Sequence, residues 1–86
     1  MPQANVVMRK VVLTSEYQPL SQNHEVVSVE VSAMPSNAAN AFFKGDTGDD
    51  VPWIPGEFHS FRSVDLSAIQ VKGTPGDLVT VIGGSW

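Results

Sequence analysis

The sequence predicts an all-β protein, built as a small antiparallel β-sandwich or a jelly-roll-like barrel of about six to eight strands. Apolar residues recur with a period of two, and no stretch longer than about seven residues shows the periodicity of an α-helix. Turns rich in glycine, proline and aspartate separate the apolar runs at intervals of about 8–12 residues. The length of 86 residues fits one domain, so residues 1–86 are expected to fold together.

The first half of the chain contains two clear strand patterns and one weaker one. Residues 5–14 have two mostly apolar faces with one charge on each, which is typical of a strand covered by the core on one side and by a partly polar neighbour, such as another subunit, on the other. Residues 25–33 alternate valine with serine and glutamate, the pattern of an antiparallel strand with one solvated face. Residues 15–23 are expected to form a loop. Residues 38–44 are expected to form a strand, because Asn40 and the short length disfavour a helix.

The last third of the chain has the pattern of a continuous meander of strands and turns, including a turn at residues 65–67. Its final strand is apolar on both faces, which indicates a central strand or one whose outer face is covered. The Gly83-Gly84 pair is expected to be a flexible segment after that strand. The predicted strands cover residues 51–54, 57–62, 68–72 and 78–82.

Composition narrows the functional classes. The chain has no cysteine, which excludes disulfides and thiolate metal sites. A domain of this size buries only about 60–65% of its unfolded surface, so oligomerisation is the remaining way to add buried area. The net charge is −4 and the five basic residues stand singly, so nucleic acid is not an expected partner. No apolar run approaches the roughly 18–20 residues of a membrane span, so no membrane is expected either.

The two histidines are the candidate metal ligands. His59 follows the Pro55-Gly56 turn, and this run resembles the metal-binding motif of cupins, which implies a minimal cupin-type metalloprotein as one alternative. The cupin pattern also requires an earlier cluster of histidines, whereas only His24 precedes this run. An ordinary polar strand position is therefore favoured for His59, and no metal or other cofactor is expected.

Other motifs that carry chemistry are weak or absent. Asp46, Asp49 and Asp50 offer oxygen ligands of the kind that calcium binds, but their spacing differs from an EF-hand loop. Aspartate and glycine also form plain solvated turns, and this interpretation is favoured. No serine lies in a nucleophile elbow, and no glycine loop opens a phosphate-binding helix. The chain is therefore not expected to be an enzyme, and no catalytic residue is assigned.

The aromatic residues allow two interpretations. They could form a platform that stacks against sugar rings, or they could fill the core and subunit contacts. The second is the commoner use of aromatic side chains in a small domain. The residues concerned are Tyr17, Trp53, Phe58, Phe61 and Trp86.

The C-terminal strand is the predicted contact with another subunit or a particle. A monomer with one solvated sheet face would not need apolar side chains on both faces of this strand. Burying a side chain as large as tryptophan would stabilise such a contact by roughly 2–3 kcal/mol. The predicted contact residues are Leu78, Val79, Val81, Ile82 and Trp86.

The pattern of residues 51–86 resembles the small β-sandwich structural proteins of tailed-bacteriophage virions. It consists of a Pro-Gly-Glu turn, an Asp-Leu-Ser turn, a short apolar strand, a Gly-Asp turn and a final apolar strand, at residues 55–57, 65–67, 69–73, 76–77 and 78–84. The resemblance implies a capsid decoration (cement) or spike-type protein that is assembled in the host cytoplasm and located in the virion. It implies no active-site residues.

The leading hypothesis is therefore a non-enzymatic structural virion protein, a capsid decoration subunit that binds the major capsid protein or another virion protein and forms homo-oligomers. Burying subunit surface would stabilise the assembled particle by mass action. The alternative, from a different functional class, is a carbohydrate- or receptor-binding module of a tail or spike that uses exposed aromatic residues.

Overall fold

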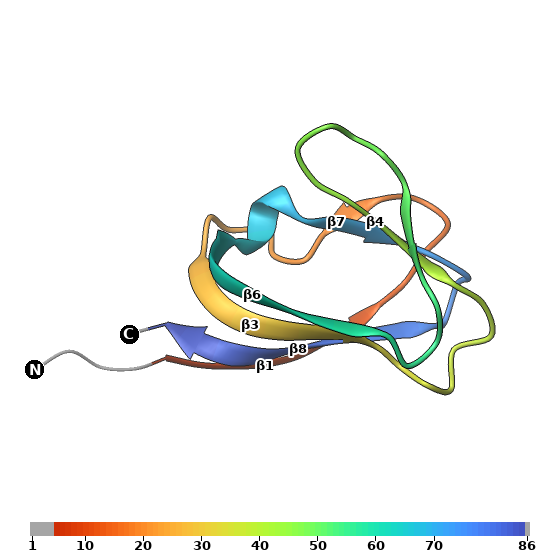
Figure 1. Ribbon diagram of the computed structural model, residues 1–86, viewed down its shortest axis with the longest axis horizontal. Helices are drawn as coiled ribbons and strands as arrows, with labels where there is room; N and C mark the ends of the chain where they lie inside the picture. The colour runs from red at the N-terminus through yellow and green to blue at the C-terminus, as the bar shows by residue number, and fades with distance from the viewer. Residues whose placement is uncertain (1–4, 86) are drawn as a thin grey trace, which may run out of the picture.

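The computed structural model describes residues 5–85, without the side chains of Asn5 and Ser85, and contains two antiparallel sheets of four strands each. The sheets form the two layers of a sandwich-like fold, and both ends of the described chain lie at the same end of the molecule (Figure 1). The all-β class is confirmed, and the strand count of the described chain lies within the predicted range. The strands are β1 (Asn5–Val12), β2 (Gln18–Pro19), β3 (Val26–Ala33), β4 (Ala41–Lys44), β5 (Val51–Trp53), β6 (Phe58–Asp65), β7 (Gln70–Lys72) and β8 (Leu78–Ser85).

The two sheets, called sheet A and sheet B, have the strand orders β1-β8-β3-β6 and β2-β7-β4-β5. Strand β8 lies between β1 and β3 and pairs with both, so the prediction of a central C-terminal strand is confirmed. The predicted meander is wrong, because β5, β6, β7 and β8 alternate between the sheets and do not pair in sequence order. The free edges of sheet A are therefore β1 and β6.

The core lies between the sheets and is made by alternate residues of the strands. Strand β3 shows this most clearly, because Val27, Val29 and Val31 are buried and the residues between them are more exposed, as predicted. Burying one Val, Leu or Phe side chain contributes about 1.5–3 kcal/mol, which makes this layer the main source of stability. The buried apolar residues are Val7, Leu13, Leu20, Val27, Val29, Val31, Ala33, Ala41, Phe43, Trp53, Leu66, Val71, Val79 and Val81.

A β-bulge interrupts the pairing of β3 with β6. The register shifts between Val27 and Val29, so Ser28 lies opposite an extra residue of β6. Ser63 of β6 adopts a φ of 50°, in the left-handed region that costs an L-residue about 1–2 kcal/mol. Its N–H donates a hydrogen bond of 3.1 Å to the hydroxyl of Ser28, which partly offsets that cost.

Gly83 lies on the other side of β3 from this bulge, within the pairing of β8. A Cβ atom at this position would lie 2.1 Å from the carbonyl oxygen of Ser28 and 2.7 Å from the Cα atom of Val29. These are backbone atoms of a paired strand and cannot move aside as a flexible side chain would. The prediction that Gly83-Gly84 is a flexible segment is therefore wrong, because both glycines pair with β1 and β3. Glycine is needed where two backbones approach this closely.

The corner after β6 also differs from the prediction. Strand β6 continues to Asp65, and the predicted turn at residues 65–67 is instead a short 3₁₀-helix, η1 (Leu66–Ala68). Asp65 is its N-cap, and its carboxylate accepts a hydrogen bond of 2.9 Å from the N–H of Ser67. The aspartate therefore ends the strand and starts the helix.

The first half of the chain shows two further local differences. Residues 38–40 precede β4 and are not part of the strand, and residues 38–39 form a bend in which the N–H groups of Ala38 and Ala39 donate to the carboxylate of Asp77. The predicted loop at residues 15–23 contains the short strand β2, which pairs with β7. Between residues 5 and 85, no helix has the length and apolar character needed to cross a membrane.

Candidate functional site

The residues predicted for a subunit or particle contact divide between the two faces of β8. Val79 and Val81 are fully buried between the sheets, where a partner cannot reach them in the folded chain. Ile82 is 51% exposed on the outer face of sheet A, and Leu78 is partly buried on the same face. Trp86 lies outside the described residues. A contact through this strand therefore stays a prediction for its outer face only.

An apolar strip runs along the outer face of sheet A, beside the β1 edge. It consists of Val6, Met8 and Val12 of β1 and Ile82 of β8, with exposed fractions of 77%, 72%, 52% and 51%. Met8 pairs directly with Ile82, so the strip crosses from β1 to β8 at this point, and the Lys10–Thr80 pair separates these residues from Val12. Lys10 is the charged residue that β1 places on this face. The two mostly apolar faces predicted for residues 5–14 thus correspond to a core face and an uncovered strip, and the partner expected over it stays a prediction.

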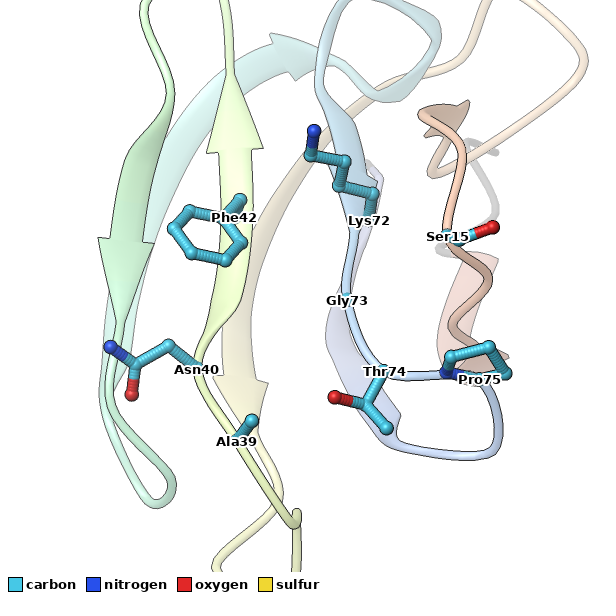
Figure 2. Close-up of a pocket in the computed structure, with 8 residues that line it drawn as sticks. All are labelled: Ser15, Ala39, Asn40, Phe42, Lys72, Gly73, Thr74 and Pro75. Carbon is cyan, nitrogen blue, oxygen red and sulfur yellow. The ribbon is translucent and has the colours of Figure 1, made fainter.

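The outer face of sheet B carries a groove of about 650 Å³ (Figure 2). It lies over β4 and β7 and the turn after β7. Phe42 faces this groove because its neighbours on β4, Ala41 and Phe43, point into the core. The residues that line the groove are Ser15, Ala39, Asn40, Phe42, Lys72, Gly73, Thr74 and Pro75.

Two lysines converge on the ring of Tyr17 beside this groove. The Nζ atom of Lys44 lies 4.2 Å from the ring centroid, and that of Lys72 lies 4.8 Å from it, within the range of cation–π attraction. The Tyr17 hydroxyl donates a hydrogen bond to the carboxylate of Asp50, and burial together with this acceptor raises the pKa of Tyr17 to about 12. Tyr17 therefore stays neutral at ordinary pH. The sequence predicts isolated basic residues, but the pairing of β4 with β7 brings these two together.

Arg9 is not available as a third cation on the surface. Its guanidinium makes a bidentate ion pair with the Glu25 carboxylate, with nitrogen–oxygen distances of 2.9 and 2.6 Å. The hydroxyl of Ser21 donates a further bond of 2.9 Å to the same carboxylate. The hydrogen bonds from Arg9 and Ser21 lower the pKa of Glu25, and the larger effect comes from Arg9. The Arg9–Glu25 ion pair links β1 to the loop before β3.

His24, Asp65 and Ser67 lie together but do not form a catalytic triad. The Nδ1 atom of His24 lies 2.8 Å from the Asp65 carboxylate and 3.1 Å from the Ser67 hydroxyl. A triad requires the serine and the carboxylate at opposite nitrogens of the imidazole. The Ser67 hydroxyl instead donates to Asp65 at 2.7 Å, as part of the cap of η1. The bonds from His24 and Ser67 hold the pKa of Asp65 well below its usual range.

His59 has one carboxylate neighbour and one aromatic neighbour. Its Nε2 atom lies 2.7 Å from Glu57, and its ring meets Trp53 edge to face with centroids 4.7 Å apart. Glu57 also accepts a hydrogen bond of 3.1 Å from the N–H of Ile54. The two hydrogen bonds lower the pKa of Glu57, and the larger effect comes from His59. Within residues 5–85, no three histidine, aspartate or glutamate side chains are grouped closely enough to hold a metal ion. The cupin alternative therefore lacks a ligand set in this part of the chain.

The acidic loop is exposed, as predicted. Asp46 accepts a bond of 2.9 Å from the N–H of Thr47, and Asp49 accepts one of 3.0 Å from the Thr47 hydroxyl. Asp50 accepts the bond from Tyr17. Asp46 and Asp49 thus have partners within the loop, which is the geometry of a solvated turn, whereas the partner of Asp50 is distant in the sequence.

The aromatic residues considered for sugar binding do not form one platform. Trp53 is only 4% exposed and stacks on Phe43 at 3.9 Å between centroids, with Phe61 at 6.5 Å. Phe58 is 60% exposed on edge strand β6 of sheet A, whereas Tyr17 contacts the two lysines of sheet B. Trp86 lies outside the described residues. The described members of this set are therefore divided between the core, sheet A and sheet B.

Phe42, the aromatic ring of the groove, is absent from the sequence-predicted candidates. The signal that could have found it is the alternation along β4, where Ala41 and Phe43 are buried and Phe42 faces outward.

The chain matches no known protein family, no curated protein and no solved structure. The functional assignment therefore rests on the geometry and chemistry of the apolar strip and the groove.

Proposed function

We propose that this chain is a non-enzymatic structural subunit that associates with further copies of itself through the apolar strip. The strip supports this proposal because exposed apolar side chains scattered singly are ordinary, whereas a contiguous apolar patch marks a contact surface. Met8 and Val6 are the most exposed members, at 72% and 77%. Side-by-side contact of these side chains between two copies would add part of the buried area that a small domain without disulfides lacks.

The position of the strip supports a second copy of the chain as the partner. Strand β1 forms the edge of sheet A, and its outer side offers backbone N–H and C=O groups for pairing, except the Val12 carbonyl, which accepts a hydrogen bond of 2.7 Å from the Gln18 side chain. The two charged residues of β1 do little to block pairing along this edge, because Arg9 forms an ion pair with Glu25 and Lys10 lies on the outer face of the sheet. Antiparallel pairing of β1 with β1 of a second copy about a two-fold axis would extend sheet A across both subunits. The two strips would then form one larger apolar surface.

The strand order supports a jelly roll as the finer description of the fold. Consecutive strands lie in opposite sheets except for β4 and β5, and the sheet orders are β1-β8-β3-β6 and β2-β7-β4-β5. Two four-stranded sheets built from an eight-stranded double Greek key define a jelly roll, which recurs in viral capsid and lectin domains. This agrees with the resemblance to small phage virion proteins.

The particular role we propose is that of a capsid decoration subunit of a virion. The joined apolar surface of a dimer would pack against the major capsid protein, and its burial would stabilise the assembled shell by mass action. Each Å² of apolar surface removed from water contributes about 25 cal/mol to the free energy of binding. Surface burial alone can therefore stabilise such a contact, and no catalytic group is involved.

Hydrogen–deuterium exchange at several protein concentrations tests the β1 pairing. We expect the outward amides of β1 to become protected as concentration rises, while the amides of edge strand β6 do not change. The Met8→Lys variant, which places a charge in the strip, should lose this concentration dependence. Exchange of β1 that is independent of concentration would contradict the pairing.

A further inference from the structure

The groove on sheet B differs from the apolar strip because its lining mixes an aromatic ring with polar groups. Figure 2 shows the ring of Phe42 broadside over β4, with its face turned outward, and the hydroxyl of Thr74 directed toward that strand. Lys72 stands on β7, across the groove from Phe42, and pairs with it in the sheet. A flat apolar surface therefore lies beside hydrogen-bonding groups within one cavity of about 650 Å³.

The polar side chains of the groove are not used to hold the fold together. The side chains of Ser15 and Thr74 are exposed to solvent and that of Asn40 is partly buried, and each can donate and accept a hydrogen bond. The nearby Asn37 shows the contrast, since its amide bonds both the N–H and the C=O of Leu78, at 2.8 and 2.9 Å. Figure 2 shows the Thr74 hydroxyl directed toward β4, whereas the Ser15 hydroxyl is directed away from Phe42. Polar groups of this kind at the wall of a cavity can orient a ligand.

The one charged side chain among the lining residues of the groove is a cation, although the whole chain has a net charge of −4. Lys72 lines it, Lys44 lies beside it over the same tyrosine ring, and none of the lining residues is acidic. Asp77 accepts hydrogen bonds from the N–H groups of Ala38 and Ala39, and Asp50 accepts one from the Tyr17 hydroxyl, so both carboxylates have partners within the protein. An anionic group entering the groove would therefore meet a cation.

We propose that this groove binds an acidic saccharide. One sugar ring lies against the face of Phe42, the sugar hydroxyls bond with Asn40 and Thr74, and a carboxylate on the sugar pairs with Lys72. The apolar C–H face of a sugar suits an aromatic ring, and amide and hydroxyl groups match sugar hydroxyls because both sides donate and accept. This inference goes beyond the proposed structural role and is independent of it, because the groove and the apolar strip lie on different sheets.

Other ligand classes fit the groove less well. Nucleic acid binding needs several cations along a backbone, and only two lysines lie here. A divalent metal ion would need carboxylates or histidines, which the lining does not contain. A fully apolar ligand would leave the amide and hydroxyl groups without partners, which costs affinity.

The test is a backbone-amide NMR titration of the full chain with three acidic probes: trigalacturonate, a hyaluronan tetrasaccharide and sialyllactose. We expect at least one probe to shift the amides of the groove residues. The uncharged counterpart of that probe, such as the methyl ester of trigalacturonate, should bind about tenfold more weakly, because it lacks the charge-assisted bond to Lys72.

Matched variants assign the contacts. Lys72→Gln and Phe42→Leu should each weaken binding by about tenfold, since one removes the cation and the other the flat ring. Thr74→Val keeps the side-chain shape, removes one hydroxyl and should weaken binding several-fold, which provides a test if Phe42→Leu does not fold. Lys10→Gln removes the same charge from the outer face of sheet A and should bind as the wild type does.

Three results would overturn the proposal. The first is the absence of groove shifts with all three acidic probes. The second is equal affinity for a charged probe and its ester, or equal shifts with inorganic sulfate, which would indicate general anion attraction. The third is an equal loss of binding in Lys72→Gln and Lys10→Gln.

Discussion

Replacing Gly83 with alanine is expected to destabilise the fold strongly, because β8 and β3 leave no room for a Cβ atom. That atom would lie 2.1 Å from the carbonyl oxygen of Ser28 and 2.7 Å from the Cα atom of Val29, well inside contact distance. Overpacking an interior costs about 1–3 kcal/mol, and the upper end applies because backbone atoms cannot repack. A chain of this length has a total stability of roughly 4–13 kcal/mol, so the change removes a large share of it.

The assay is urea and thermal denaturation followed by circular dichroism. A loss of about 3 kcal/mol corresponds to a fall in melting temperature of roughly 12–24 °C for a domain of this size. Gly45→Ala is the matched control, because a Cβ atom there would meet nothing within 4 Å and Gly45 has no positive φ. Its stability should stay the same or rise by up to about 1 kcal/mol. If Gly83→Ala unfolds within about 0.5 kcal/mol of the wild type, the close approach of the strands is refuted.

Three further substitutions test individual side chains. Asp49→Asn should change the free energy of unfolding by less than about 0.5 kcal/mol, and added calcium should not shift its melting temperature or that of the wild type; a calcium-dependent melt would identify an ion site. Asp65→Asn should melt below the wild type at neutral pH. Because folding lowers the pKa of Asp65 from 3.8, its stabilisation is complete above about pH 4 and is lost as pH falls through the folded-state pKa, so the two proteins should converge in acid. A gap that stays constant with pH would contradict this account. Arg9→Gln should lose up to about 1 kcal/mol through its pair with Glu25, and the loss should shrink at high salt; a loss that is insensitive to salt would indicate packing rather than charge.

The fold class could be predicted from the sequence because each strand of a two-layer β protein buries one face. Because successive side chains of a strand point to opposite faces, apolar residues alternate with polar ones along β3, where Val27, Val29 and Val31 are buried. The sequence also predicts the central position of β8, whose side chains are apolar on both faces. The order of the strands could not be predicted, because short turns fit both a meander and a chain that passes between two sheets.

The candidate sites were only partly predictable, because they depend on residues distant in the chain. The apolar strip could be expected from the two apolar faces of residues 5–14, but its position at a sheet edge depends on which strand pairs with β1. The two lysines beside the groove stand on β4 and β7 and meet only through the pairing of those strands. Val79 and Val81 lie on the core face of β8, so the contact predicted for this strand stays a prediction for its outer face.

Sedimentation velocity over a wide range of concentrations is the most direct test of the claim that the apolar strip joins copies of this chain. The account predicts that the wild type associates reversibly as concentration rises and that Met8→Lys stays monomeric with an unchanged circular dichroism spectrum. Ile54→Lys, which changes another side chain that is 61% exposed but lies outside the strip, should associate like the wild type. A wild type that is monomeric at every concentration, or a Met8→Lys variant that associates as Ile54→Lys does, would contradict the claim.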